Sequence, residues 1–124
     1  MLNSSDTYTT IPVSDLDRAR RFYESALGIE PMMVTDGGVM YRSGGTRFFV
    51  YPSAHKASGH IQMSWVVSDI KAEVAALRGK GIEFLQYEVP GVKMVDGIAQ
   101  SGPAVWTAYF NDPDGNLLGL TQIG

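Results

Sequence analysis

The alternation of apolar and polar residues predicts a strand followed by a helix near the start of the chain. Thr9, Ile11 and Val13 recur with a period of two, as on one face of a strand. An apolar stripe with three- and four-residue spacing follows and stops at Gly28, as on one face of a helix. Ser14 or Asp15 can cap this helix. The residues of the stripe are Leu16, Ala19, Tyr23, Ala26 and Leu27.

The same order of elements returns roughly 55 residues later. Alternation at Ile61, Met63, Trp65 and Val67 predicts a second strand, and Ile70, Val74 and Leu77 then lie on a helical stripe. Two short sequence motifs also recur: Val13-Ser14-Asp15-Leu16 returns as Val67-Ser68-Asp69-Ile70, and Gly28-Ile29-Glu30 returns as Gly81-Ile82-Glu83. The chain therefore contains a duplicated module, and function is expected in the cleft between the two copies.

Each helix is followed by segments that are typical of strands. We expect strands near 31–35, 39–43 and 46–51 in the first half and near 82–88, 104–110 and 117–122 in the second. The turn at 111–115 joins the last two. The glycine-containing segment 90–103 predicts a long loop that acts as a lid or contacts a ligand. A flexible excursion or a short irregular strand is the alternative for this segment.

These elements define the expected fold. Residues 1–124 form a single α+β domain, with module 1 at about 5–55 and module 2 at about 58–124. We expect two βαβββ modules that form a curved mixed sheet around a cleft, with both helices on its outer face.

Composition and charge narrow the possible partners. The net charge of −3 and the scattered lysines and arginines predict no binding to nucleic acid or to membranes. The chain has no cysteine and therefore neither disulfides nor thiolate chemistry. Because no segment reads as a signal peptide or a membrane span, we expect a cytoplasmic protein.

Two separated motifs carry a resemblance to a known family. The first runs through residues 11–19, Phe22-Tyr23 and Leu27-Gly28, and the second is Tyr109-Phe110-Asn111-Asp112-Pro113-Asp114-Gly115-Asn116-Leu117. Together with the repeat, they resemble the vicinal oxygen chelate superfamily of glyoxalases, bleomycin-resistance proteins and extradiol dioxygenases. The resemblance implies the fold above. It also implies a homodimer if the chain is a binder of the bleomycin-resistance type.

The resemblance also implies where a metal would lie. Metalloenzymes of the superfamily place ligands at four equivalent positions, which correspond here to Tyr8, Phe49, Gln62 and Gly119. Divalent metals prefer imidazole and carboxylate donors, which this set lacks. We therefore expect no metal or other cofactor. The alternative is a partial site for Zn²⁺, Ni²⁺ or Mn²⁺ at His60 and Gln62, completed by a loop carboxylate such as Glu88 or Asp96.

Alternation extends the expected lining of the cleft from these positions. On the strand 104–110 it leaves open whether Trp106 with Phe110, or Thr107 with Tyr109, faces inward. The mixture of aromatic, hydroxyl, amide and cationic side chains suits a small organic ligand. The candidate ligand-binding residues are Tyr8, Thr10, Arg47, Phe49, Gln62, Ser64, Trp106, Gly119 and Thr121.

The leading functional hypothesis is a metal-independent protein that binds a small organic molecule. A glyoxalase-like lyase or isomerase that uses a metal is the first alternative. A metal-free acid–base enzyme is also open, with His60 and Tyr8 as candidate catalytic residues. A further alternative is an accessory module whose cleft is occupied by a protein partner. The sequence leaves open whether the chain is an enzyme.

Overall fold

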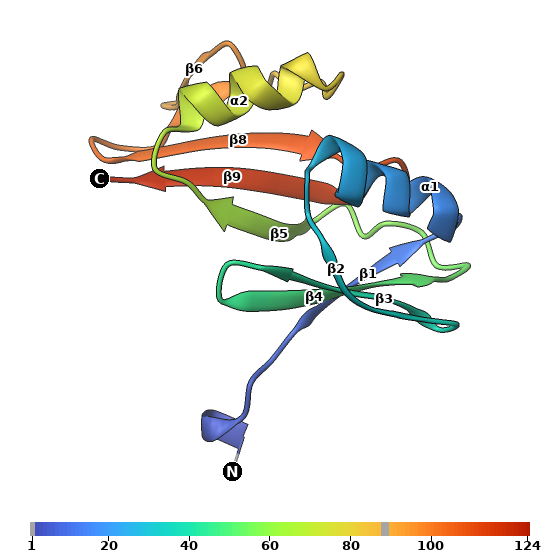
Figure 1. Cartoon of the computed structure of the whole chain (residues 1–124). Coiled ribbons are helices and arrows are strands. Elements are labelled where there is room, and N and C mark those ends of the chain that lie inside the picture. The colour runs from blue at the N-terminus through green and yellow to red at the C-terminus, as the bar shows by residue number, and fades with distance from the viewer. Residues whose placement is uncertain (1, 88–89) are drawn as a thin grey trace.

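The first module forms a four-stranded mixed sheet. The computed structural model describes residues 2–87 and 90–124. A 3₁₀ turn at Leu2–Ser4 begins the described chain and lies away from both sheets (Figure 1). The sheet has the order β1-β4-β3-β2, with β1 parallel to β4. Its strands are β1 (Thr9–Val13), β2 (Pro31–Thr35), β3 (Gly38–Ser43) and β4 (Thr46–Pro52).

The second module forms a five-stranded sheet that repeats this plan. Its order is β5-β9-β8-β7-β6, and β5 is parallel to β9 as β1 is to β4. The predicted α+β fold of two βαβββ modules is confirmed. No helix within the described ranges is long and apolar enough to cross a bilayer. The strands are β5 (Ile61–Val66), β6 (Lys93–Val95), β7 (Ile98–Gln100), β8 (Val105–Asn111) and β9 (Leu117–Ile123).

The repeated Val-Ser-Asp motif places an aspartate N-cap at the start of each helix. Asp15 accepts a hydrogen bond from the Arg18 N–H, and Asp69 accepts one from the Ala72 N–H, each at 3.1 Å. The first helix, α1 (Leu16–Arg20), continues as a π-helical segment over Arg21–Ala26. The second, α2 (Ile70–Gly79), is a regular α-helix. Both modules therefore begin their helix with the same type of N-cap.

Two predictions about module 2 are wrong. The strand expected at 82–88 is reduced to one bridge between Phe84 and Phe110, and residue 88 lies outside the described residues. The long loop expected at 90–103 instead contains the β6–β7 hairpin, which is nearer to the alternative of a short strand. The reason is the Asp96-Gly97 turn, whose φ angles of +53° and +79° suit a tight hairpin.

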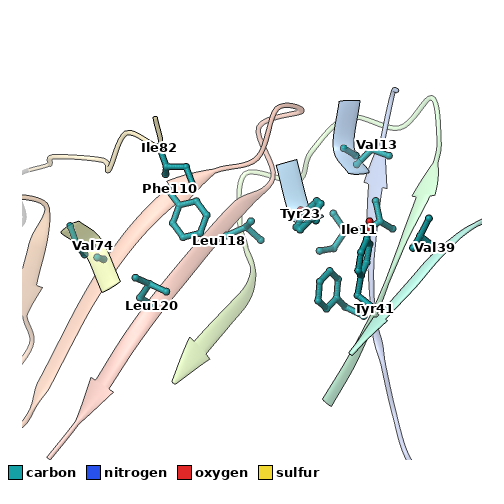
Figure 2. Packing of buried hydrophobic residues seen from close by; sticks show 14 of the residues in the cluster. Ile11, Val13, Tyr23, Val39, Tyr41, Val74, Ile82, Phe110, Leu118 and Leu120 are labelled. Atoms are coloured by element: carbon teal, nitrogen blue, oxygen red, sulfur yellow. The ribbon is translucent and has the colours of Figure 1, made fainter. Parts of the chain in front are cut away.

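The helices cover one face of each sheet and share a single apolar core (Figure 2). On the strands of module 1, buried residues alternate with more exposed ones, as with Ile11 and Val13 on β1 and Phe48 and Val50 on β4. The Trp65 ring of β5 lies 6.4 Å from that of Phe48 and 6.3 Å from that of Phe110. The core therefore crosses the boundary between the modules on their helix-bearing sides.

A buried carboxylate, Asp112, ties the two modules together. Its Oδ2 accepts hydrogen bonds at 2.8 Å from the Tyr23 hydroxyl and from the Asn116 side-chain amide. Its Oδ1 accepts the N–H groups of Asp114 and Asn116 at 2.9 Å. The Asn116 amide also donates to the carbonyl of Pro12 at 2.8 Å. The turn before β9 is thus bonded to both the helix and the first strand of module 1.

The electrostatics of this junction raise the pKa of Tyr23 and lower that of Asp114. Burial raises the pKa of the Tyr23 phenol far above its usual value, and the nearby Asp112 raises it further. Burial would also raise the pKa of Asp114. Hydrogen bonds from Ser14 and the charge of Arg18, 3.3 Å away, outweigh burial and hold this pKa below its usual value. Tyr23 therefore acts as a proton-bearing donor to a carboxylate acceptor.

Replacing Tyr23 with Phe tests the contribution of this junction to stability. The variant removes one donor to the buried Asp112 carboxylate and should lower the free energy of unfolding by about 1–2 kcal/mol. Urea denaturation measures the change. The matched control is Tyr51→Phe, at a partly exposed tyrosine on the other side of the sheet. Equal destabilisation by both substitutions would contradict the role assigned to the Asp112 junction.

Candidate functional site: the open faces of the two sheets

The side of each sheet opposite its helix carries most of the candidate residues, and we call it the open face. In module 1 the strand register places Thr10 beside Phe49 and Arg42 beside Arg47. The open face of module 1 consists of Tyr8, Thr10, Met40, Arg42, Arg47, Phe49 and Tyr51.

Three aromatic rings form a row on the open face of module 1. The centroids of Tyr8 and Phe49 are 6.3 Å apart in an edge-on arrangement, and those of Phe49 and Tyr51 are 6.1 Å apart with nearly parallel planes. Tyr8 is 55% exposed, so the end of the row is accessible to a ligand. The nearly parallel rings of Phe49 and Tyr51 offer an apolar surface for stacking, with Tyr8 edge-on beside it.

Arg47 supplies a cation beside this row. Its Nη2 lies 3.2 Å from a carboxylate oxygen of Asp6, in the segment before β1. Because both side chains are substantially solvated, this ion pair is weak and easily exchanged for a ligand group. The predicted positive charge is therefore present on the open face.

The open face of module 2 centres on Gly119. The register places Ser64 and Tyr109 on either side of Gly119, and Thr107 beside Thr121. The rings of Tyr87 and Tyr109 lie 6.4 Å apart. Burial raises the pKa of the Tyr87 phenol, and Tyr109 raises it further. The open face of module 2 consists of Ser64, Val66, Tyr87, Thr107, Tyr109, Gly119 and Thr121.

This register answers the question that alternation left open on β8. Thr107 and Tyr109 face the open side, whereas Trp106 and Phe110 pack with the core on the helix-bearing side. Trp106 therefore does not lie with the other candidate ligand-binding residues. Alternation along β4 from Phe49 predicts that Tyr51 lies on the open face. The place of Tyr87 on the open face could be found only from the tertiary structure.

Gln62 and His60 occupy the junction between the sheets without forming a pair. The Gln62 side-chain amide donates to the carbonyl of Thr10 at 2.8 Å, across from β5 to β1. His60 is exposed, and its N–H donates to the hydroxyl of Ser58 at 3.1 Å. Within the described ranges, its imidazole has no hydrogen bond or ion pair. Gln62 thus has a structural contact across the two sheets.

The four positions that correspond to metal ligands do not fit a divalent cation. Phe49 and Gly119 have no side-chain donor. A Cβ atom at Gly119 would lie 2.7 Å from the Ser64 Oγ and 2.9 Å from the Tyr109 Cε1, so the space for a longer side chain is already filled. Over residues 2–87 and 90–124 no three His, Asp or Glu side chains gather to hold a metal.

Of the two loop carboxylates named for the alternative metal site, Asp96 does not complete it. Asp96 lies at the β6–β7 turn, where it lines a cavity against α2 on the helix-bearing side. Glu88 lies outside the described residues. The absence of a cofactor remains a prediction.

Comparison with protein families identifies the class. The family model of the Glyoxalase/Bleomycin resistance protein/Dioxygenase superfamily matches residues 7–120, and the chain belongs to this superfamily. No curated protein matches the chain significantly.

Solved structures with the same fold include an antibiotic binding protein and glyoxalase family proteins. TnmS3, an antibiotic binding protein from Streptomyces sp. CB03234, is similar with 23% identity and a TM-score of 0.72, covering 100% of this chain and 99% of its own. A glyoxalase family protein from Bacillus anthracis has 20% identity and a TM-score of 0.73, covering 94% and 91%. A glyoxalase/bleomycin resistance protein/dioxygenase from Alicyclobacillus acidocaldarius has 20% identity and a TM-score of 0.70, covering 97% and 92%. At these identities the likeness concerns the fold.

The packing over Gly119 predicts that a single added methyl group at this position lowers the stability of the fold. Gly119→Ala should lower the free energy of unfolding by about 1–3 kcal/mol, because the new Cβ would overlap Ser64 and the Tyr109 ring. Thermal or urea denaturation measures the change. Gly79→Ala is the matched control, since a Cβ there meets no atom within 4 Å, and it should be neutral or slightly stabilising. A neutral Gly119→Ala variant would show that Tyr109 does not lie over this position.

Proposed function

We propose that this protein binds a small, uncharged, planar organic molecule on its open faces without the help of a metal. The observation that carries the proposal is the row of Tyr8, Phe49 and Tyr51, which offers a stacking surface where metalloenzymes of the superfamily are expected to hold an ion. Ser64, Thr107 and Thr121 add hydroxyl groups that can orient polar atoms of a ligand. The antibiotic-binding activity in the description of TnmS3 is compatible with this proposal.

The proposal includes a homodimer that encloses the ligand. Because the shared core lies on the helix-bearing sides, no layer of residues 2–87 and 90–124 covers the open faces as the helices cover the opposite sides. Val66 on β5 is 75% exposed, and Met33 on β2, which pairs with the open-face residue Met40, is 57% exposed. A second copy placed against these faces would bury them and surround a ligand bound to the aromatic row.

The ligand proposal predicts that aromatic fragments bind and that Phe49 is essential to their binding. Uncharged naphthol, quinoline and indole compounds serve as probes in a titration followed by protein NMR. The amide signals of residues on the open faces should shift, with Ser64 and Tyr109 among them. Phe49→Ala should weaken the best fragment by about three- to tenfold, because it removes the central ring.

Tyr41→Phe serves as the control in this titration, because Tyr41 is buried on the helix-bearing side of the neighbouring strand. It should leave fragment affinity unchanged. Shifts confined to other surfaces, or equal affinity of wild type and Phe49→Ala, would contradict the proposed binding surface.

The metal-free character is tested by elemental analysis of protein that has been purified without chelator. We expect less than stoichiometric Zn, Ni and Mn, and no saturable binding on titration with Ni²⁺ or Zn²⁺, because the donor set lacks imidazole and carboxylate groups. One metal per chain that is lost in both His60→Ala and Gln62→Ala would instead establish the metal-dependent alternative.

The dimer is tested by analytical ultracentrifugation of wild type and Val66→Asp. The wild type should sediment as a dimer, and the variant should weaken association at least about tenfold by placing a charge in the contact. Because Val66 is exposed within one chain, the variant should keep the unfolding midpoint of the isolated fold. Thr46→Asp, at an exposed position of β4 near its turn, should leave association unchanged. A wild-type monomer at all concentrations would contradict the dimer.

A further inference from the structure

A cavity on the helix-bearing side of module 2 is separate from the open faces. It has a volume of about 480 Å³ and lies between α2, the β6–β7 hairpin and the Trp106 side chain of β8. This volume is within the range of small-molecule sites. In Figure 1 the hairpin strand β6 lies beside α2 at the far end of the molecule from the first sheet.

The floor of this cavity is apolar and aromatic. Val74 is buried against the sheet, whereas Trp106 and Ile98 are only partly covered. The register pairs Trp106 with Gln100 of β7, so one wall combines an indole ring with an amide. A flat ligand can stack on the partly covered indole, because stacking buries apolar area and brings the two π systems into contact.

The rim of the cavity is positively charged. Lys71 and Arg78 project from one side of α2, two turns apart, and Lys93 projects from β6. In the part of the chain that the structure describes, none of the three forms an ion pair. Among the lining residues that the structure describes, Asp96 is the only one with a carboxylate. A local excess of positive charge on a chain with a net charge of −3 favours an anionic ligand.

Arg78 is held in place without being neutralised. Its Nη2 donates to the carbonyl oxygen of Asp96 at 2.7 Å, and its guanidinium carbon lies 5.7 Å from the centre of the Phe84 ring. Asp96 itself has a φ angle of +53°, which is uncommon for a residue other than glycine. The bond to its carbonyl thus joins the hairpin to α2 and orients a cation at the mouth of the cavity.

We propose that this cavity binds a small aromatic anion. The ring stacks on Trp106 between Val74 and Ile98, and a carboxylate, sulfonate or phosphate group lies between Lys71, Arg78 and Lys93. The ligand class differs from the uncharged molecule proposed for the open faces, and the two sites share no lining residue.

The probe for this site is 8-anilinonaphthalene-1-sulfonate, followed by its fluorescence and by protein NMR. Binding should shift the indole N–H signal of Trp106 and the amide signals of Ile98 and Gln100. The double variant Lys71→Gln/Lys93→Gln should weaken the probe roughly fivefold, since it removes two exposed charges. The matched double variant Lys56→Gln/Lys80→Gln, at exposed lysines outside the cavity, should not.

The uncharged analogue N-phenyl-1-naphthylamine and added salt test the role of charge. The analogue should bind at least about threefold more weakly than the sulfonate, and 0.5 M NaCl should reduce that difference. Equal affinity of the two probes, or no effect of Lys71→Gln/Lys93→Gln, would overturn the proposal.

Phe49→Ala separates this proposal from the function proposed for the open faces. The variant should leave sulfonate binding unchanged. If it abolishes that binding and the NMR shifts fall on Ser64 and Tyr109, the anion site is refuted while the open-face site stands. If fragments fail to bind the open faces but the sulfonate shifts the Trp106 signal, the open-face site is refuted while the anion site stands.

Discussion

The fold depends on one buried carboxylate, that of Asp112, which accepts hydrogen bonds from its own turn and from the helix of the other module. A buried carboxyl group in this position is stable because four donors hydrogen-bond to its oxygens. Asn116 extends the network to the carbonyl of Pro12, at the end of the strand that begins the first module. The two sheets are therefore fixed relative to each other by directional bonds as well as by the aromatic core.

Because that junction does not use the open faces, the residues on these faces can differ between the two modules. The helix caps, the parallel pairing of the first and last strands and the buried stripes are common to both modules, because each module needs them to fold. The open faces are not under this constraint. One carries the row of Tyr8, Phe49 and Tyr51, and the other carries Tyr109 packed over Gly119. Stacking surfaces thus occupy positions where the superfamily also supports metal chemistry.

Much of this structure follows from local sequence, and the failures have identifiable causes. A cap of the first helix at Ser14 or Asp15 was predictable because an N-cap acts within one helical turn, and the structure uses Asp15. The faces of β4 and β9 followed from alternation around Phe49 and Gly119. The β6–β7 hairpin was missed because the Asp96-Gly97 turn signal lies within a glycine-containing segment that reads as a loop. The face of Trp106 depends on the register of β8 with β9, and the Tyr87–Tyr109 contact depends on tertiary packing.

The central claim is that the open faces recognise a ligand through aromatic rings and not through a bound metal ion. Addition of Mn²⁺ to the ¹⁵N-labelled protein tests it most directly, because a bound paramagnetic ion broadens the NMR signals of nearby amides. We expect only weak, non-saturating broadening near exposed carboxylates. Selective broadening of the Tyr8, Gln62 and Ser64 amides that saturates at one ion per chain would contradict the claim.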